Sequence, residues 1–233
     1  MKMPMSFLND LRDFFFPRLC LTCGARLLRD EDGFCCSCMT DFPYTNIGNK
    51  PGNEVEKYFW GRFPIERATS VFYYAKGGSV AHILYAMKYY GRYRLCEKMG
   101  KLMAHELLSC GFFEGIDCMV PVPLHKSRLR GRGYNQSFLL AKGISDVTTI
   151  PVFDNVLVRL RNNVTQTHKG AFERWKNVDR LFQATEKSCV LEGKHILLVD
   201  DVLTTGATLV ACADALSAIK DIRISVITLA WAK

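Results

Sequence analysis

Short apolar runs recur along this 233-residue chain and predict buried strands. Four of them are long or strongly apolar, namely ATSVFYYA (68–75), DCMVPVP (117–123), HILLV (195–199) and ISVITLAWA (224–232). A further strand is expected at about 155–160. Each run is separated from the next by a longer segment with a different spacing of apolar residues.

Those intervening segments carry apolar residues at every third or fourth position, which is typical of helices. The clearest begins at about Ser79, where Val80, Ile83, Leu84 and Met87 share one face. Further helices are expected over 95–108, at about 135–144 and from Thr208 onward. Strands that alternate with helices indicate an α/β fold built on a parallel sheet flanked by helices.

The first 65 residues do not follow this alternation. The opening MKMPMSFLNDLRDFFFP predicts a short amphipathic helix that ends at Pro17, and its charges interrupt the apolar core that a signal peptide needs. Residues 41–65 are rich in Gly, Pro and Asn and predict a linker. Since no run of 18 apolar residues occurs, we expect no membrane insertion and a cytoplasmic location.

Two Cys-x-x-Cys pairs lie between these segments, and eleven residues separate them. The pairs are Cys20 with Cys23 and Cys35 with Cys38, a spacing that predicts one tetrahedral structural Zn²⁺ site. Cys36 is the spare thiol. A redox role is the alternative for a single pair, but ten cysteines in a cytoplasmic chain favour metal ligands and free thiols over disulfides.

The chain has a formal net charge of +8, and the excess is concentrated in one region. Residues 121–180 hold eleven Lys or Arg against four Asp or Glu, whereas the remainder is nearly balanced. Such a surplus predicts an anion site. Pyrophosphate, a nucleotide and a nucleic-acid backbone are all compatible with such a site. The alternative is a basic surface that contacts only solvent.

The segment VDDVLTTGAT (199–208) combines two adjacent acids with hydroxyl residues and a glycine. Its place between a strand and a helix is where open α/β sheets bind ligands. Backbone amides, the helix dipole and threonine hydroxyls attract a phosphate, and carboxylates accept hydrogen bonds from a diol. Together they predict a ribose 5-phosphate ligand. A Walker B strand is the rival reading, but no Gly-Lys-Ser/Thr loop accompanies it. A strand with a simple N-cap is the other alternative.

This segment resembles the phosphoribosyl-pyrophosphate (PRPP) binding motif of type I phosphoribosyltransferases. Together with VPVPLHKSRLRGRGYNQS (120–137) and LVRLRNNVTQTHKGAFERWKNV (157–178), the chain resembles the ComF family of competence-associated phosphoribosyltransferase-like proteins. The resemblance implies a type I phosphoribosyltransferase-like parallel sheet with a small amino-terminal zinc-ribbon-like module. It divides the chain into a helix and zinc module (1–50), a linker (51–66) and the transferase-like domain (67–233).

The resemblance also implies site residues. The PRPP motif comprises Asp200, Asp201, Val202, Leu203, Thr204, Thr205, Gly206, Ala207 and Thr208. Lys88, Arg128, Arg132 and Arg174 are the candidate pyrophosphate contacts, the second and third of them in a basic loop after the strand 117–123. Asn135, Gln136 and Gln166 are further candidates. Asn135 is equally well explained as a helix N-cap.

Two functions remain open. The first is a phosphoribosyltransferase that binds PRPP with Mg²⁺ and transfers to an acceptor that the sequence does not identify. The second is a non-catalytic accessory protein of competence that binds a nucleotide or single-stranded DNA. The ComF resemblance implies a link to DNA uptake and a competence-machinery protein as a partner, and it does not by itself imply catalysis.

Overall fold

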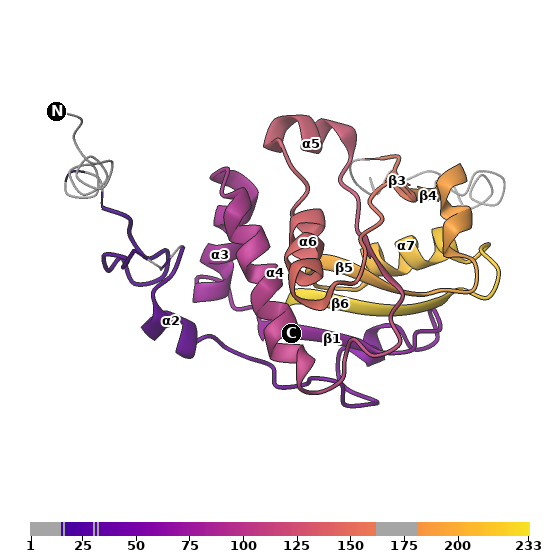
Figure 1. Ribbon diagram of the computed structural model, residues 1–233, viewed down its shortest axis with the longest axis horizontal. Coiled ribbons are helices and arrows are strands. Elements are labelled where there is room, and N and C mark those ends of the chain that lie inside the picture. Colours follow the sequence, from indigo (N-terminus) through magenta and orange to yellow (C-terminus); the bar gives the residue numbers. More distant parts are fainter. Residues whose placement is uncertain (1–14, 16, 30, 32, 162–180) are drawn as a thin grey trace, which may run out of the picture.

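The computed structural model describes residues 15, 17–29, 31, 33–161 and 181–233 (Figure 1). The expected amino-terminal helix lies almost wholly outside these residues. So do the site candidates Gln166 and Arg174.

Four parallel strands form the central sheet in the order β1-β6-β5-β2 (Figure 1). Their bounds are β1 (Ala68–Tyr73), β2 (Cys118–Pro121), β5 (His195–Leu203) and β6 (Arg223–Trp231). All four were expected from their apolar runs, and the middle strands are buried on both faces as continuous runs require. The predicted parallel sheet is confirmed.

Helices cover both faces of this sheet. On one face, α3 (Ser79–Tyr89), α4 (Tyr93–Leu108) and α6 (Gln136–Thr148) share a core with alternate residues of the central strands, such as Leu197 and Val199. On the other face, α7 (Ala207–Leu216) packs against the intervening residues, such as Ile196 and Leu198. Neighbouring residues of β5 therefore face different layers.

The α4 and α6 helices cross at a pair of glycines. A β-carbon on Gly143 would lie 2.1 Å from the carbonyl oxygen of Glu97, and one on Gly100 would lie 2.1 Å from that of Leu140. Both distances are far below van der Waals contact, so the two backbones can approach this closely only without side chains. This contact holds α6 against the scaffold, with its amino-terminal end at the edge of the sheet.

The strand expected at about 155–160 forms, but outside the main sheet. It is β3 (Leu157–Arg159), which pairs antiparallel with β4 (Phe182–Ala184) in a separate ribbon. Only Leu157 of its three residues is buried, and a strand with a single buried side chain cannot occupy a sheet that is covered on both faces. The ribbon contributes that side chain to the core beneath α7.

The basic segment after β2 was expected to be a loop, and this expectation is wrong. Residues Lys126–Arg132 form the short helix α5, which stands apart from the sheet at the top of Figure 1. The His125 ring accepts a hydrogen bond from the Ser127 amide at its start, and Gly133 ends it in the left-handed conformation. Lys, Arg and Leu are good helix formers, and the caps at both ends stabilise these two turns.

The remaining regular elements are short. They are α2 (Cys36–Thr40) and the 3₁₀ turns η1 (Glu56–Tyr58) and η3 (Glu186–Leu191). Residues 51–66, expected to be a linker, contain η1 and bury Val55 and Phe59 in the core beneath α7. Among the described residues, no helix combines the length and apolar character needed to cross a membrane.

Candidate functional site

The two acids of VDDVLTTGAT lie within β5, because the strand continues to Leu203 rather than ending at Val199. The Asp201 carboxylate pairs with the Lys88 ammonium of α3 at 2.8 Å. Asp200 Oδ1 instead accepts a 3.0 Å hydrogen bond from the Ser137 hydroxyl of α6 and a 2.9 Å bond from the Asp201 amide. Each acid is thus held by a different helix.

The environment of Asp200 disfavours its charged form. Burial raises the pKa of this carboxyl, and the neighbouring Asp201 charge raises it further, to about 7. The hydrogen bonds from Ser137 and the Asp201 amide, together with the Lys88 charge, oppose the shift without cancelling it. A carboxylate placed in this way is costly to the fold, and such positions are concentrated at functional sites.

The hydroxyl loop follows the acids directly. Gly206 adopts the left-handed conformation, with φ of 73°, and is the N-cap of α7. Thr204 and Thr208 stand on either side of it and face the same cavity as the acids. Leu203, by contrast, is buried in the core beneath α7, and Thr205, Gly206 and Ala207 do not line the cavity.

That cavity is a cleft of about 810 Å³ at the carboxyl edge of the sheet. It brings together residues from α3, the end of β2, α5, the start of α6, β3, β5 and α7. Among the sequence-predicted site residues, those that line it are Lys88, Arg128, Arg132, Gln136, Asp200, Asp201, Val202, Thr204 and Thr208. The cleft thus places cations, acids and hydroxyls around one space.

Arg159 also lines the cleft and was missed in the sequence. It comes from the β3–β4 ribbon, and its guanidinium carbon lies 5.4 Å from the centre of the Phe182 ring. Burial, and then the Arg128 charge, lower its pKa. The only sequence signal was a cation within an otherwise apolar run, and that signal does not indicate which space the side chain faces.

The segment Tyr134-Asn135-Gln136 supports the elements that line the cleft. The Tyr134 hydroxyl and the Gln136 side-chain amide donate to the Met87 carbonyl at 2.7 and 3.2 Å. These bonds fix the last turn of α3, where Lys88 is located. The Asn135 side chain accepts from the Ser137 amide and donates to the Val122 carbonyl, so Asn135 is the N-cap of α6.

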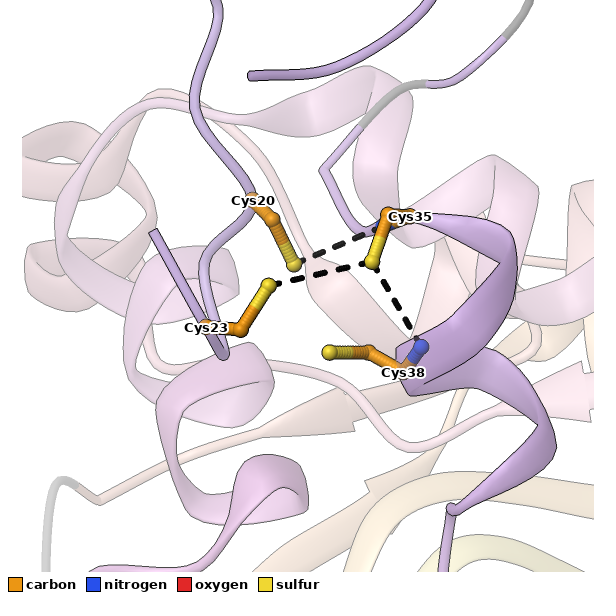
Figure 2. Close-up of side chains that lie close together, drawn as sticks. All are labelled: Cys20, Cys23, Cys35 and Cys38. Carbon is orange, nitrogen blue, oxygen red and sulfur yellow. Dashed lines mark hydrogen bonds between the residues drawn. The ribbon is translucent and has the colours of Figure 1, made fainter. Parts of the chain in front are cut away.

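The four predicted metal ligands form a separate cluster. The ligand atoms of Cys20, Cys23, Cys35 and Cys38 lie within 4.8 Å of one another and point toward a common centre (Figure 2). Cys23 Sγ and Cys35 Sγ are 3.8 Å apart. Four thiolates at Zn–S distances of about 2.3 Å in a tetrahedron would be separated by about 3.8 Å, so the donor set fits a zinc ion.

Hydrogen bonds shift the pKa values of two of these thiols in opposite directions. Burial would raise the pKa of Cys20, but amide hydrogen bonds, including a 3.4 Å bond from Cys35, lower it to about 6. Hydrogen bonding with Cys23, and then burial, raise the pKa of Cys38. Outside the four ligands, the Glu31 carboxylate joins the two pairs by accepting from the Leu28 amide at 2.8 Å and from the Cys36 amide at 2.7 Å. The Glu31 contacts favour a preformed arrangement of the two pairs.

The cysteine cluster is packed onto the transferase-like sheet. Phe34, Phe42 and Phe72 form a row of edge-to-face contacts with centroid separations of 5.1 and 5.4 Å. Phe72 belongs to β1. Leu95 of α4 lies in the same core, so the cluster and the sheet share apolar contacts.

Comparison with known proteins agrees with this geometry. The phosphoribosyl transferase domain family matches residues 135–232. Competence protein F of Haemophilus influenzae is 36% identical over 93 residues, which are 40% of this chain and 41% of the relative. DNA utilization protein YhgH of Salmonella typhi is 30% identical over 156 residues, 66% of each chain. Competence protein ComFC of Bacillus subtilis is 41% identical over 91 residues, 39% of this chain and 34% of the relative.

The fold, the cleft and the domain match define a protein with a type I phosphoribosyltransferase fold. Within that class, the chain belongs to the ComF family, to which its competence and DNA-utilization relatives point. The matched regions span less than two thirds of the first relative and about two thirds, at 66%, of the second.

Proposed function

We propose that the cleft binds PRPP, or another phosphoribosyl ligand, and that the protein transfers the phosphoribosyl group to an acceptor. The observation that carries this proposal is the convergence of Asp200, Asp201, Thr204 and Thr208 in one cavity at the carboxyl edge of the sheet. The same cavity contains four Lys or Arg side chains, which suit a doubly phosphorylated ligand.

Each group has a role in this proposal. The acids accept hydrogen bonds from the ribose hydroxyls, and the threonine loop holds the 5-phosphate at the start of α7. Arg128 and Arg132 hold the pyrophosphate, on which charge grows as it leaves. Lys88 pairs with Asp201 at 2.8 Å and lines the same cleft as these two arginines.

Two metals complete the proposal. Mg²⁺ bound to oxygens of PRPP would supply charge neutralisation, and few protein ligands are needed for it. Zn²⁺ held by the four cysteines would be structural, since a set of four thiolate ligands leaves no open coordination position. From the names of the relatives, we propose that the activity serves the use of DNA that a cell has taken up.

Calorimetry with PRPP and Mg²⁺ tests ligand binding. Asp200→Asn and Asp201→Asn should each weaken binding by about tenfold or more, because each removes charge-assisted hydrogen bonds. Asp214→Asn is the matched control, since it removes an exposed carboxylate from α7 outside the cleft. A scan of bases and amines for pyrophosphate release then tests transfer. Absence of PRPP binding by the wild type would refute the proposed function.

A surface beside the cleft supports the accessory function as a second candidate. Tyr85 and Tyr89 of α3, Tyr90 in the turn that follows, and Tyr93 at the start of α4 are 48–64% exposed. Tyr85 contacts Tyr89 and Tyr90 with ring centroids 4.6 and 5.4 Å apart, and the Arg132 guanidinium lies 5.9 Å from the Tyr89 centroid. Exposed aromatic rings beside cations are typical of surfaces that stack single-stranded bases.

Titration with oligothymidylate tests this candidate. Binding should weaken by about 0.7 log units per log salt for each phosphate contacted. Tyr89→Ala and Tyr90→Ala should reduce affinity, whereas Trp60→Ala, which removes an exposed ring from residues 51–66, should not. Oligonucleotide binding without pyrophosphate release from any acceptor would favour the accessory function over transfer.

A further inference from the structure

The segment that precedes β1 reaches the hydroxyl loop that follows β5. The Arg62 guanidinium donates a 2.7 Å hydrogen bond from Nη1 to the Thr205 carbonyl oxygen. The same nitrogen donates to the Tyr58 carbonyl at 3.2 Å. The Thr205 contact joins positions 143 residues apart, so no local sequence pattern around VDDVLTTGAT indicates it.

The backbone segment that carries Arg62 is packed into the core. Val55 and Phe59 on the same segment are fully buried, at 0% and 1% exposure, in the core beneath α7. The Trp231 indole N–H donates to the Tyr58 hydroxyl at 3.1 Å, at the carboxyl end of β6. The Arg62 amide itself donates to the Phe59 carbonyl at 3.0 Å. The backbone from which the Arg62 side chain extends is therefore fixed relative to the sheet, and its guanidinium is held by the bonds to the Thr205 and Tyr58 carbonyls.

The contact sets the direction of one peptide group. The described residues contain no cis peptide, and in a trans peptide the C=O and the following N–H point in opposite directions. Because the Thr205 oxygen points at Arg62, the Gly206 N–H points to the opposite side. A β-carbon at Gly206 would lie 3.5 Å from Arg62 Nη1 and 3.6 Å from Tyr58 Cβ, so these side chains also lie against the glycine.

Thr204 and Thr208, which bracket this peptide, line the cleft, whereas Thr205, Gly206 and Arg62 do not. The peptide N–H that points away from Arg62 therefore points toward the side of the two threonines and the cleft. We infer that Arg62 is a positioning residue, which orients the Thr205–Gly206 peptide so that its N–H faces an anionic group in the cleft. The identity of that anion, a 5-phosphate, rests on the proposed function, but the orienting contact does not.

Binding of ribose 5-phosphate and of ribose to three variants tests the inference. Arg62→Met should weaken ribose 5-phosphate binding about tenfold, as expected for the loss of one well-oriented donor to a charged group, and should leave ribose binding unchanged. Arg62→Lys retains one donor and should recover part of the affinity. Arg223→Met removes the same charge at the opposite end of β6 and should match the wild type. Equal affinity in Arg62→Met and wild type would overturn the inference, as would equal losses in the two methionine variants.

A second measurement needs no ligand. Hydrogen exchange of the Gly206 and Ala207 amides should be faster in Arg62→Met than in Arg223→Met, because the loop loses its anchor. If the wild type binds neither ribose 5-phosphate nor PRPP, the proposed function fails, and this measurement still decides the role of Arg62. Unchanged exchange at both amides would overturn that role.

Discussion

The cysteine cluster and the cleft assemble their residues in opposite ways. All four thiols come from positions 20–38, and each pair closes its own turn. The residues that line the cleft extend from Lys88 to Thr208 and lie on seven elements or their ends. A site of the first kind can form locally around a metal ion, whereas a site of the second kind exists only after the sheet has formed.

The two regions also treat negative charge differently. In the cluster, amide hydrogen bonds lower the pKa of Cys20 to about 6 and favour its anion, whereas hydrogen bonding with Cys23 raises the pKa of Cys38. In the cleft, burial and a neighbouring charge raise the pKa of Asp200 to about 7, so the anion is disfavoured. The cleft thus retains a carboxyl group whose charged form is costly, which is typical of functional sites.

The largest effect is expected from removing a thiol. Cys23→Ser should lower the zinc content from about one per chain to well under half and disorder the amino-terminal module, because such sites contribute folding energy directly. Far-ultraviolet circular dichroism should show that the sheet persists. Cys36→Ser is the matched control, since Cys36 lies outside the four-ligand group. Full zinc content in Cys23→Ser would contradict local assembly.

The next effect concerns the pH dependence of folding. Because the folded pKa of Asp200 lies above its ordinary value of 3.8, the native state binds more protons than the unfolded state between about pH 4 and 7. This contribution to stability is therefore lost as pH rises through about 7, by on the order of 4 kcal/mol. Asp200→Asn should remove it.

Urea unfolding at pH 4 and pH 8 measures this contribution. The Asn variant should be more stable than the wild type at pH 8 and similar to it at about pH 4, and Asp214→Asn should follow the wild type. His195 acts in the opposite sense, because burial lowers its pKa and stability falls as pH drops below about 6.5. Because His195 is present in both proteins, its contribution cancels when Asp200→Asn is compared with the wild type. Parallel pH profiles for wild type and Asp200→Asn would contradict the prediction.

A smaller effect is expected from disturbing the contact between α4 and α6, which should affect the cleft and leave the cysteine cluster unchanged. Gly143→Ala should lower the free energy of unfolding by about 2–3 kcal/mol, because its methyl group meets the Glu97 carbonyl. It should also weaken ribose 5-phosphate binding, since α6 carries Ser137, while the zinc content stays unchanged. Gly131→Ala places a methyl group in open space and should not destabilise. Loss of zinc in Gly143→Ala would show that the two regions depend on each other.

The smallest effect is expected at the start of α6. Asn135→Ala should destabilise the fold by about 1 kcal/mol through loss of the N-cap, and Asn135→Ser should restore most of that energy. Thermal unfolding measures both. If Asn135 instead reads a base, the serine variant would retain stability and lose binding of an acceptor base.

Local chemistry made much of the molecule predictable. The apolar runs marked the four sheet strands, the helical spacing marked α3, α4, α6 and α7, and the thiol spacing marked the cluster. In each case the signal lies within the element itself. A strand buried on both faces needs a continuous apolar run, and a helix buried on one face needs apolar residues at every third or fourth position. Four thiols around one ion need the spacing of two Cys-x-x-Cys pairs.

The sequence by itself thus determined the four sheet strands, the helices α3, α4, α6 and α7, the four-cysteine cluster and the acid-hydroxyl motif. Tertiary structure decided which side chains share the cleft. It placed Arg159 there from a separate ribbon, formed a helix from the basic segment, and used Tyr134 and Gln136 to brace Lys88. It also brought Arg62 to Thr205. These contacts join residues far apart in the chain, and their partners are fixed only when parallel strands align their carboxyl ends at one edge.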